Sequence, residues 1–313
     1  VPSINNMGFL LQSQGKLAEA EPYFREGLEK CRRVLGEEHP NTLASINNIG
    51  NLLLSQGKLG EAEPYLRESL EKRRRVLGEE HPSTLNSINT MGFLLQAQGR
   101  LAEAEPYYRE TLEKRRSVLG EEHPDTLGSI NNMGFLLRSQ GKLAEADPYA
   151  REAMEKSRSV LGREHPDTLG SIGNMASLLQ AQGKHQEAID LLTPTEPAAR
   201  KAFTGGNARR LASFLTALGR ARVGLGYDAD RFKMAESNLL EAHPIFESAK
   251  DRGPTHKDTL GCVQGLIDLF TAWDAAEPGK GYDAKAAEWK ATLDAASATA
   301  PRPPAEPEAP KKK

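Results

Sequence analysis

The 313-residue chain lacks several features that mark common classes of protein. Its only two cysteines, Cys31 and Cys262, lie far apart without partners at metal-ligand spacing, so we expect a reducing compartment and no disulfide framework. No apolar run of about 18 residues occurs, which excludes a membrane-spanning helix. The 41 Lys and Arg nearly balance 43 Asp and Glu, which excludes a strongly basic nucleic-acid binder. We therefore expect a cytoplasmic protein with no nucleic-acid or membrane partner.

What the chain does contain is an internal repeat of 42 residues. The string Gly-Glu-Glu-His-Pro occurs at 36–40, 78–82 and 120–124, and Gly-Arg-Glu-His-Pro occurs at 162–166. Four similar copies begin near Ile4, Ile46, Ile88 and Ile130, and a fifth, weaker copy begins at Ile172. Such a period is typical of an array of one supersecondary unit.

Each copy has the pattern of two helices. Pro40 suits the first position of a helix, because its missing N–H would be unpaired there in any case. Apolar residues then recur at helical spacing until Gly57, which can adopt the left-handed conformation that ends a helix. A second helix is predicted over 59–77. Its basic end, Arg73 to Arg75, is interpreted as a solvated helix terminus.

These residues together resemble the tetratricopeptide repeat. The matching residues of the first copy are Met7, Gly8, Leu11, Gly15, Ala20, Phe24 and Leu28. The period of 42 residues and the linker L-G-x-x-H-P-x-T look specifically like the kinesin-light-chain subtype. The resemblance covers roughly residues 1–192 and implies an all-α fold, a right-handed solenoid of antiparallel helix pairs.

The 42-residue repeat pattern is lost after Leu192, where the sequence Thr-Pro-Thr-Glu-Pro interrupts the fifth copy. Helical patterns at 207–224, 236–249, 266–273 and 284–293 lead us to interpret 193–298 as degenerate repeats that cap the solenoid. His256 to Leu260 echoes the linker, with Lys257 replacing proline. The remaining tail, 299–313, is rich in proline and lysine and is predicted to be disordered.

No metal, cofactor or catalytic site is predicted. The linker histidines of successive copies lie too far apart to share one ion, because adjacent repeats are separated by two helix layers of roughly 8–10 Å each. The serines at 45, 87, 129 and 171 recur with the repeat, so none is a unique nucleophile. Gly224-Leu225-Gly226 lacks the third glycine of a dinucleotide-binding loop. We therefore expect a protein that is not an enzyme.

The candidate binding residues lie on the first helix of each copy. Asparagine recurs there although it is a mediocre helix former, which requires a reason. Two interpretations are open: the amides bond neighbouring repeats together, or they bind the backbone of an extended peptide. In tetratricopeptide proteins an Asn at this position lines the peptide groove, and Thr90 departs from it. Aromatic residues one turn on, and Arg138 beyond them, would anchor the ligand if they face the groove; in the alternative interpretation, the phenylalanines are buried between repeats. The predicted groove comprises Asn5, Asn6, Phe9, Asn47, Asn48, Asn51, Asn89, Phe93, Asn131, Asn132, Phe135, Arg138 and Asn174.

Three hypotheses for function follow. The first is a non-enzymatic scaffold that holds a protein or peptide partner in the concave face. The second is the regulatory or substrate-recruiting tail of a longer bacterial serine/threonine protein kinase, which the text around Trp273 and Trp289 resembles and which a start within a repeat at Val1 would fit. The third, a motor-cargo adaptor, lacks a heptad segment. We also expect that the first half-repeat could pair with a second chain.

Overall fold

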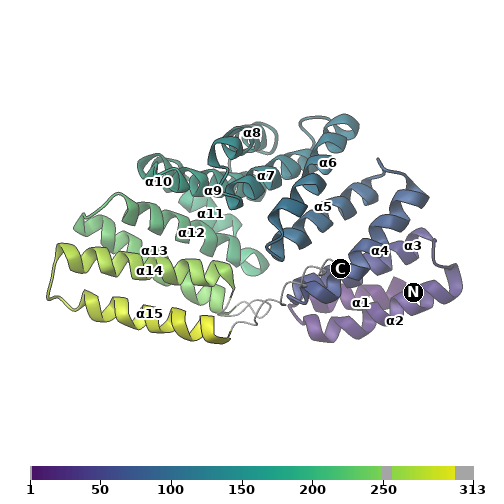
Figure 1. The fold of residues 1–313 in the computed structure, drawn as a ribbon, viewed down its shortest axis with the longest axis horizontal. Helices are drawn as coiled ribbons and strands as arrows, with labels where there is room; N and C mark the ends of the chain where they lie inside the picture. Colours follow the sequence, from purple (N-terminus) through teal and green to yellow (C-terminus); the bar gives the residue numbers. More distant parts are fainter. Residues whose placement is uncertain (1, 249–255, 300–313) are drawn as a thin grey trace, which may run out of the picture.

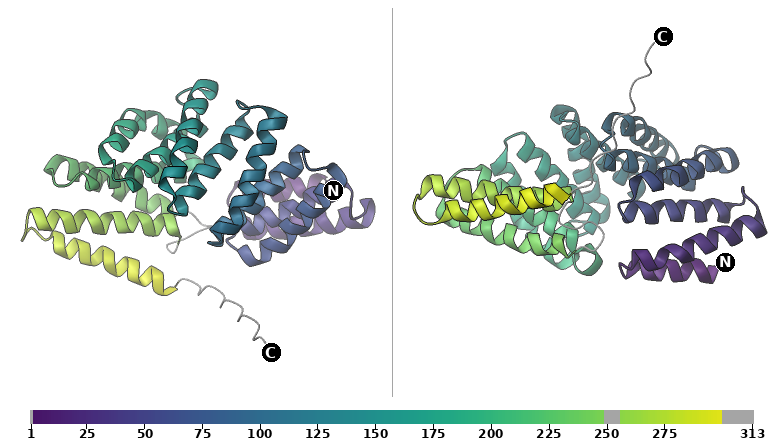
Figure 2. Two further views of the ribbon diagram at one scale, coloured as in Figure 1. Left: turned by 45° about the horizontal axis from the view of Figure 1, so that its top comes forward. Right: turned by 60° about the horizontal axis from the view of Figure 1, so that its bottom comes forward.

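A computed structural model describes residues 2–248 and 256–299, and these form an all-helical array without a strand. The helices are stacked in chain order along an arch, with α1 to α4 at one foot and α14 and α15 at the other (Figures 1 and 2). The α-helices are α1 Pro2–Ser13, α2 Leu17–Leu35, α3 Pro40–Ser55, α4 Leu59–Leu77, α5 Pro82–Ala97, α6 Leu101–Leu119, α7 Pro124–Ser139, α8 Leu143–Leu161, α9 Pro166–Ala181, α10 His185–Leu192, α11 Glu196–Ala202, α12 Ala208–Gly224, α13 Ala229–Glu247, α14 Lys257–Ala276 and α15 Tyr282–Thr299.

The linker histidines start the first helices, as the sequence predicts. The Nδ1 atom of His39 accepts a hydrogen bond from the backbone N–H of Asn41 at 3.1 Å, and Pro40 follows as the first helical residue. The same cap recurs in each later copy, and His256 caps α14 in the same way although Lys257 replaces the proline. Each cap satisfies one of the unpaired N–H groups at the start of a helix. The period of 42 residues is therefore a period of helix starts.

Glycine lets the two helices of a copy approach closely. A Cβ atom built on Gly50 would lie 2.5 Å from Cδ2 of Leu66, which α4 presents to α3. On Gly92 it would lie 3.1 Å from the ring of Tyr108. Gly57 ends the first helix with φ +74°, the left-handed conformation predicted for it. These contacts belong to one continuous core that runs from Ala20 to Ala221.

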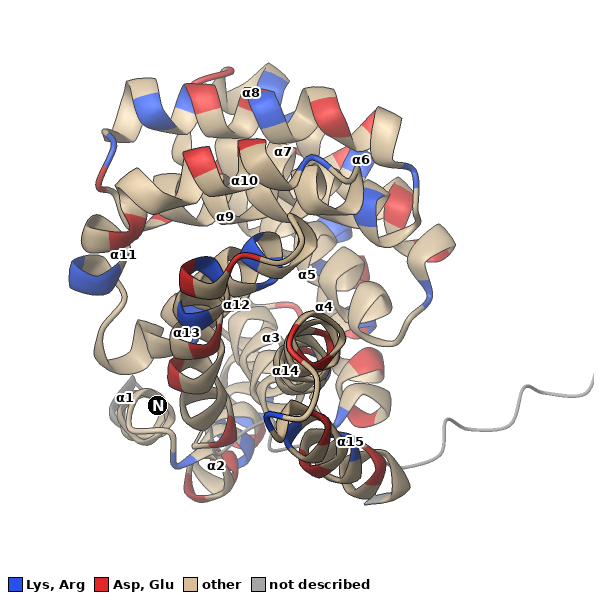
Figure 3. Ribbon diagram, turned by 90° about the vertical axis from the view of Figure 1, so that its left-hand side faces the viewer, with Lys and Arg blue, Asp and Glu red and all other residues tan. Residues whose placement is uncertain are grey.

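The basic ends of the second helices are not simply solvated, which corrects the sequence interpretation. Arg73 is buried, and its guanidinium donates to the carbonyl of Ser83 and to Oγ of Ser87 in the next first helix. Arg74 forms an ion pair with Glu110 of the following repeat at 2.8 Å. Equivalent pairs recur along the array, and Figure 3 shows both charge signs side by side along α6 and α8. The cations tie neighbouring repeats together.

The chain after Leu192 continues the array with irregular pieces. The Thr-Pro-Thr-Glu-Pro sequence ends α10 at Leu192, and a short 3₁₀ turn, Thr193–Thr195, leads into α11. A second 3₁₀ turn, Gly205–Asn207, precedes α12. Helix α13 begins at Ala229, earlier than predicted, because Asp228 caps it by accepting from the N–H of Arg231. The predicted disordered tail lies outside the described residues, apart from Thr299, which ends α15.

A second core joins the last helices. Phe232, Phe270 and Trp273 are buried, and Trp273 stacks on Tyr282 with ring centroids 4.5 Å apart. This aromatic cluster fixes α14 and α15 against α12 and α13. None of the helices in the described ranges is both long and apolar enough to cross a membrane.

Candidate ligand-binding groove

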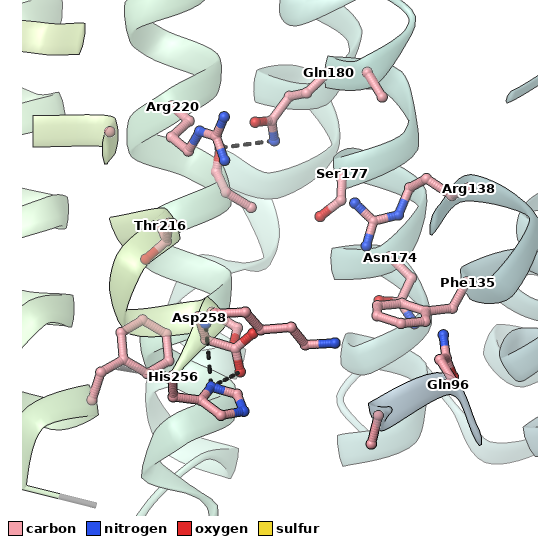
Figure 4. Close-up of a pocket in the computed structure, with 18 of the residues that line it drawn as sticks. Gln96, Phe135, Arg138, Asn174, Ser177, Gln180, Thr216, Arg220, His256 and Asp258 are labelled. Carbon is pink, nitrogen blue, oxygen red and sulfur yellow. Dashed lines mark hydrogen bonds and ion pairs between the residues drawn. The ribbon is translucent and has the colours of Figure 1, made fainter. Parts of the chain in front are cut away.

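A groove with a volume of about 1390 Å³ lies between the middle repeats and the last helices. One side, here called the repeat wall, consists of residues of α5, α7 and α9. The opposite side, here called the C-terminal wall, consists of residues of α12 and α14 with His256. Figure 4 shows Phe135, Arg138 and Asn174 facing Thr216, Arg220 and Asp258 across this space.

The repeat wall follows from helical spacing. Asn174, Ser177 and Gln180 are three residues apart on α9, so they lie on one face of the helix. Phe135 and Arg138 occupy the corresponding positions on α7, and Phe93 and Gln96 occupy them on α5. Because the copies are equivalent, the same face of each first helix points into the groove.

The groove offers exposed aromatic surface beside fixed polar groups. The side chain of Phe93 remains 41% exposed although it belongs to a packed array. Gln96 is held in place because its Oε1 accepts from the hydroxyl of buried Tyr108 at 2.8 Å. Its Nε2 has no partner among the described residues. The exposed ring of Phe93 therefore offers apolar surface to a ligand, whereas the amide nitrogen of Gln96 is itself buried behind it.

The asparagine row bonds neighbouring first helices together. Nδ2 of Asn132 donates to Oδ1 of Asn89 at 3.0 Å, and Nδ2 of Asn174 donates to Oδ1 of Asn131 at 3.0 Å. Thr90 cannot make the equivalent bond and instead donates to the carbonyl of Asn86. The inter-repeat interpretation therefore has direct geometric support. Asn174 makes this inter-repeat bond and also lines the groove.

The first copies continue the row with weaker contacts. Nδ2 of Asn5 lies 3.5 Å from Oγ of Ser45, and Oδ1 of Asn47 accepts from Ser87 at 3.4 Å. Of the predicted site residues, the structure brings four together in the groove: Phe93, Phe135, Arg138 and Asn174. The predicted residues outside its lining are Asn5, Asn6, Phe9, Asn47, Asn48, Asn51, Asn89, Asn131 and Asn132. Asn131 lines a small crevice beside Asn174.

Phe9 has a different environment from Phe93 and Phe135. Its ring packs edge-on against Phe24, with centroids 5.0 Å apart, while 47% of its surface remains exposed. Met7 and Leu10 of the same helix are also exposed, whereas the residue equivalent to Leu10 in the next copy, Leu52, is fully buried. These apolar side chains of α1 are thus exposed among the described residues, on the helix for which the sequence predicts self-association.

The C-terminal wall was not predicted from the sequence. Gln180 of α9 donates through Nε2 to the carbonyl of Ala217 at 2.9 Å, and Arg210 pairs with Asp167 at 3.1 Å. These two bonds hold α12 against α9. Helix α14 packs against α12 in turn and brings Lys257 to 5.4 Å from the ring centroid of Phe135. The similarity of residues 256–260 to the linker sequence predicted the start of this helix. It did not predict that the helix lies opposite the fourth copy.

Positive charge is concentrated at the centre of the groove. The guanidinium of Arg138 lies 4.9 Å from the ring centroid of Phe135, which Lys257 also approaches. Burial, together with the positive charge of Arg220, lowers the pKa of Arg138 below its usual value. Asp258 is engaged elsewhere, because it pairs with Arg209 at 2.9 Å. The three cations therefore face the groove without a carboxylate partner among the described residues.

A metal site requires clustered ligands, and a reactive thiol requires an accessible thiolate. In the part of the chain that the structure describes, no group of three or more His, Cys, Asp or Glu side chains could hold a metal ion. Both cysteines are buried, and burial raises the pKa of the Cys262 thiol to about 11, which disfavours the reactive thiolate. The polar groups of the groove can bind and orient a ligand.

Comparison with known proteins agrees with this architecture. The family model described as tetratricopeptide repeat matches residues 1–74, 44–117, 83–130 and 125–201. No curated protein matches the sequence significantly. A kinesin-light-chain-type protein from Podospora anserina with nearly identical TPR-like repeats is 26% identical, with a TM-score of 0.57 over 64% of this chain and 94% of that one.

More distant solved structures share the fold. BtubC (BKLC) from P. vanneervenii is 19% identical, with a TM-score of 0.59 over 74% of this chain and 91% of its own. A Rap protein complexed with Competence and Sporulation Factor is 14% identical and covers 94% of this chain and 74% of its own, with a TM-score of 0.68. The similarity to the Rap protein extends over the C-terminal helices as well as the repeats.

Proposed function

This chain belongs to the tetratricopeptide repeat family, and we propose that it is a non-enzymatic scaffold that binds an extended peptide segment of a partner protein in its concave groove. Repeat arrays of this kind use their concave surface for binding. The observation that carries the proposal is the groove itself, in which exposed Phe93 and half-buried Phe135 lie beside amide groups of α5 and α9.

The size of the groove favours a peptide over a small molecule. Small-molecule sites are usually about 300–1,000 Å³, whereas this groove measures about 1390 Å³ and extends past three successive repeats. A protein of the same fold, the Rap protein, was solved in complex with Competence and Sporulation Factor. An extended peptide would place side chains against the rings of Phe93 and Phe135 and its backbone within reach of Asn174.

The experiment that tests this function uses a random peptide library displayed on phage and selected against the full chain. Peptides recovered with the wild-type protein are synthesised, and their affinities for Phe93→Ala, Phe135→Ala and the double variant are measured by fluorescence polarisation. Truncating an aromatic anchor costs about 2 kcal/mol at a binding hot spot, or roughly 30-fold in Kd. We expect a loss of that size for each single variant.

A matched control separates groove binding from general apolar adhesion. Val118 is 42% exposed near the end of α6 and lies outside the groove, so Val118→Ala should leave the affinity unchanged. Equal losses in Val118→Ala and Phe93→Ala, or affinities that none of the Phe variants change, would reject the groove as the binding site. Circular dichroism melting of each variant shows whether the fold is retained.

A further inference from the structure

The C-terminal wall carries a cluster of cations that the repeats do not contain. We infer that Arg220 and Lys257, together with Arg138 of the repeat wall, form an anion-recognition site that selects peptides bearing an anionic side chain. This inference rests on the proposed function, because the peptide is the one that the groove holds. It assigns the degenerate helices α12 and α14 a role in specificity in addition to their role in capping the array.

The first observation is the contrast between these cations and those of the outer surface. Many Arg and Lys residues of the second helices form ion pairs within or between repeats, as Lys114 does with Glu79 and Glu110 and Arg116 does with Glu152. Neither Arg220 nor Lys257 has an ion pair within residues 2–248 and 256–299, although both are exposed. Charged groups left unpaired on facing walls are free to pair with a ligand.

The second observation is that the cations are held close together although they repel one another. Burial and the positive charge of Arg220 both lower the pKa of Arg138, whereas the charge of Asp258, which forms an ion pair with Arg209, acts in the opposite direction. The groove lining holds three cations against two carboxylates, Asp258 and Asp268. A bound anion would relieve this repulsion, and an Arg side chain can bind it through two parallel hydrogen bonds.

The third observation is that the packing orients the cations toward the groove. A Cβ atom on Gly265 of α14 would lie 3.0 Å from Cγ of Arg220, so the missing side chain makes room for the arginine stem between α12 and α14. Lys257 and Arg138 both lie against the ring of Phe135. Figure 4 shows Arg220 and Arg138 on opposite sides of the space, with Ser177 and Gln180 near them. A side chain entering between the walls would meet both guanidinium groups.

The neighbouring titratable groups do not neutralise the positive charge of Arg138, Arg220 and Lys257. Asp268, on the exposed face of α14, accepts a hydrogen bond from Gln264 one turn earlier. His256 uses Nδ1 to cap α14 by accepting from the backbone N–H of Asp258. Asp258 forms an ion pair with Arg209, and Asp268 accepts from Gln264, so neither forms an ion pair with Arg138, Arg220 or Lys257, and an anionic ligand would supply that partner.

The test uses the peptides selected from the random library on the wild-type chain. For each peptide we would synthesise versions with Glu, phosphoserine or Gln at its acidic position and measure Kd against wild type, Arg220→Gln, Lys257→Gln and the double variant. Gln keeps the stem of Arg220 beside Gly265. We expect acidic residues to be enriched in the selected peptides. In the double variant, we expect the Glu peptide to lose about tenfold or more in affinity while the Gln peptide changes little.

A matched control removes one positive charge elsewhere. Arg163 is exposed in the linker after α8 and lies outside the groove, so Arg163→Gln should leave all three affinities unchanged. Peptides that depend on Phe93 and Phe135 but show no acidic enrichment and no charge coupling would overturn the anion site and leave the proposed function intact. Failure to select any peptide that depends on those two rings would reject both. Tighter binding of phosphoserine than of Glu would support the site and identify phosphate as the preferred anion.

Discussion

The close approach of the paired helices at Gly50 leads to a quantitative prediction for Gly50→Ala. The new Cβ would lie 2.5 Å from Cδ2 and 2.7 Å from Cγ of Leu66, a side chain only 1% exposed. The branched Cγ cannot move away without shifting α4. Overpacking of this kind costs about 1–3 kcal/mol, and the better helix propensity of alanine returns up to about 1 kcal/mol.

Because a 2.5 Å contact belongs at the upper end of this range, about 2–3 kcal/mol of cost less about 1 kcal/mol of return leaves a net loss of about 1–2 kcal/mol, which should lower the melting midpoint by about 2–6 °C. Gly128→Ala is the matched control. Gly128 also lies inside a first helix, but a Cβ atom there would have no neighbour within 4 Å. Without overpacking, only the propensity gain remains, so this variant should melt at the same temperature or slightly higher.

The assay is thermal unfolding followed by circular dichroism at 222 nm, with midpoints compared because repeat arrays need not unfold in one step. Ala176 occupies the same register in the fifth copy, where the opposing Leu192 is the last residue of α10. Alanine is thus accommodated where the second helix ends early. If Gly50→Ala melted at or above the wild-type midpoint, the glycine would not be there for close packing and the reasoning would be refuted.

Three further expectations concern the melting midpoint of the folded chain. Asn132→Ala should lower the melting midpoint by a few degrees through loss of its bond to Asn89, worth about 1 kcal/mol; an unchanged midpoint would show that the amide bond contributes nothing. Hydrogen bonds from Lys142 and Arg109 lower the pKa of Glu105 to about 2. The ionised Glu105 therefore contributes to the free energy of unfolding fully above pH 4.5, and this contribution is lost as the pH falls toward 2. The melting midpoint of Glu105→Gln should therefore decrease less between pH 4.5 and 2 than that of the wild type. An equal decrease in both proteins would contradict this. EDTA should leave the melting midpoint unchanged. A lower midpoint in EDTA that zinc restores would show that the chain holds a structural metal.

Much of the repeat region could be predicted because its structure is determined locally. The proline after each linker histidine and the glycine at the end of each first helix define the helix pairs, so α3 and α4 were predicted from one copy of the text. The buried position of Arg73 was missed. Cys31 and Ser157 occupy its register in other copies, and this mixture of buried residue types was the signal that could have indicated an inward-facing position.

The C-terminal wall could not be predicted from local pattern. Its position depends on the small rotation between successive repeats, which accumulates along the array until α14 lies opposite α7. No spacing in the sequence relates Lys257 or Arg220 to Phe135. The kinase-tail hypothesis stays a prediction, because it concerns a catalytic domain that this chain does not contain.

The central claim, that a peptide binds between the two walls, is tested most directly by site-specific photo-crosslinking. A photoreactive benzoylphenylalanine replaces Phe93 in the groove or, as the control, Val118 on the outside of α6. Each protein is irradiated with a labelled peptide selected on the wild-type chain. The account predicts a covalent adduct from position 93, mapped by mass spectrometry, and none from position 118. An adduct from position 118 without one from position 93 would contradict it.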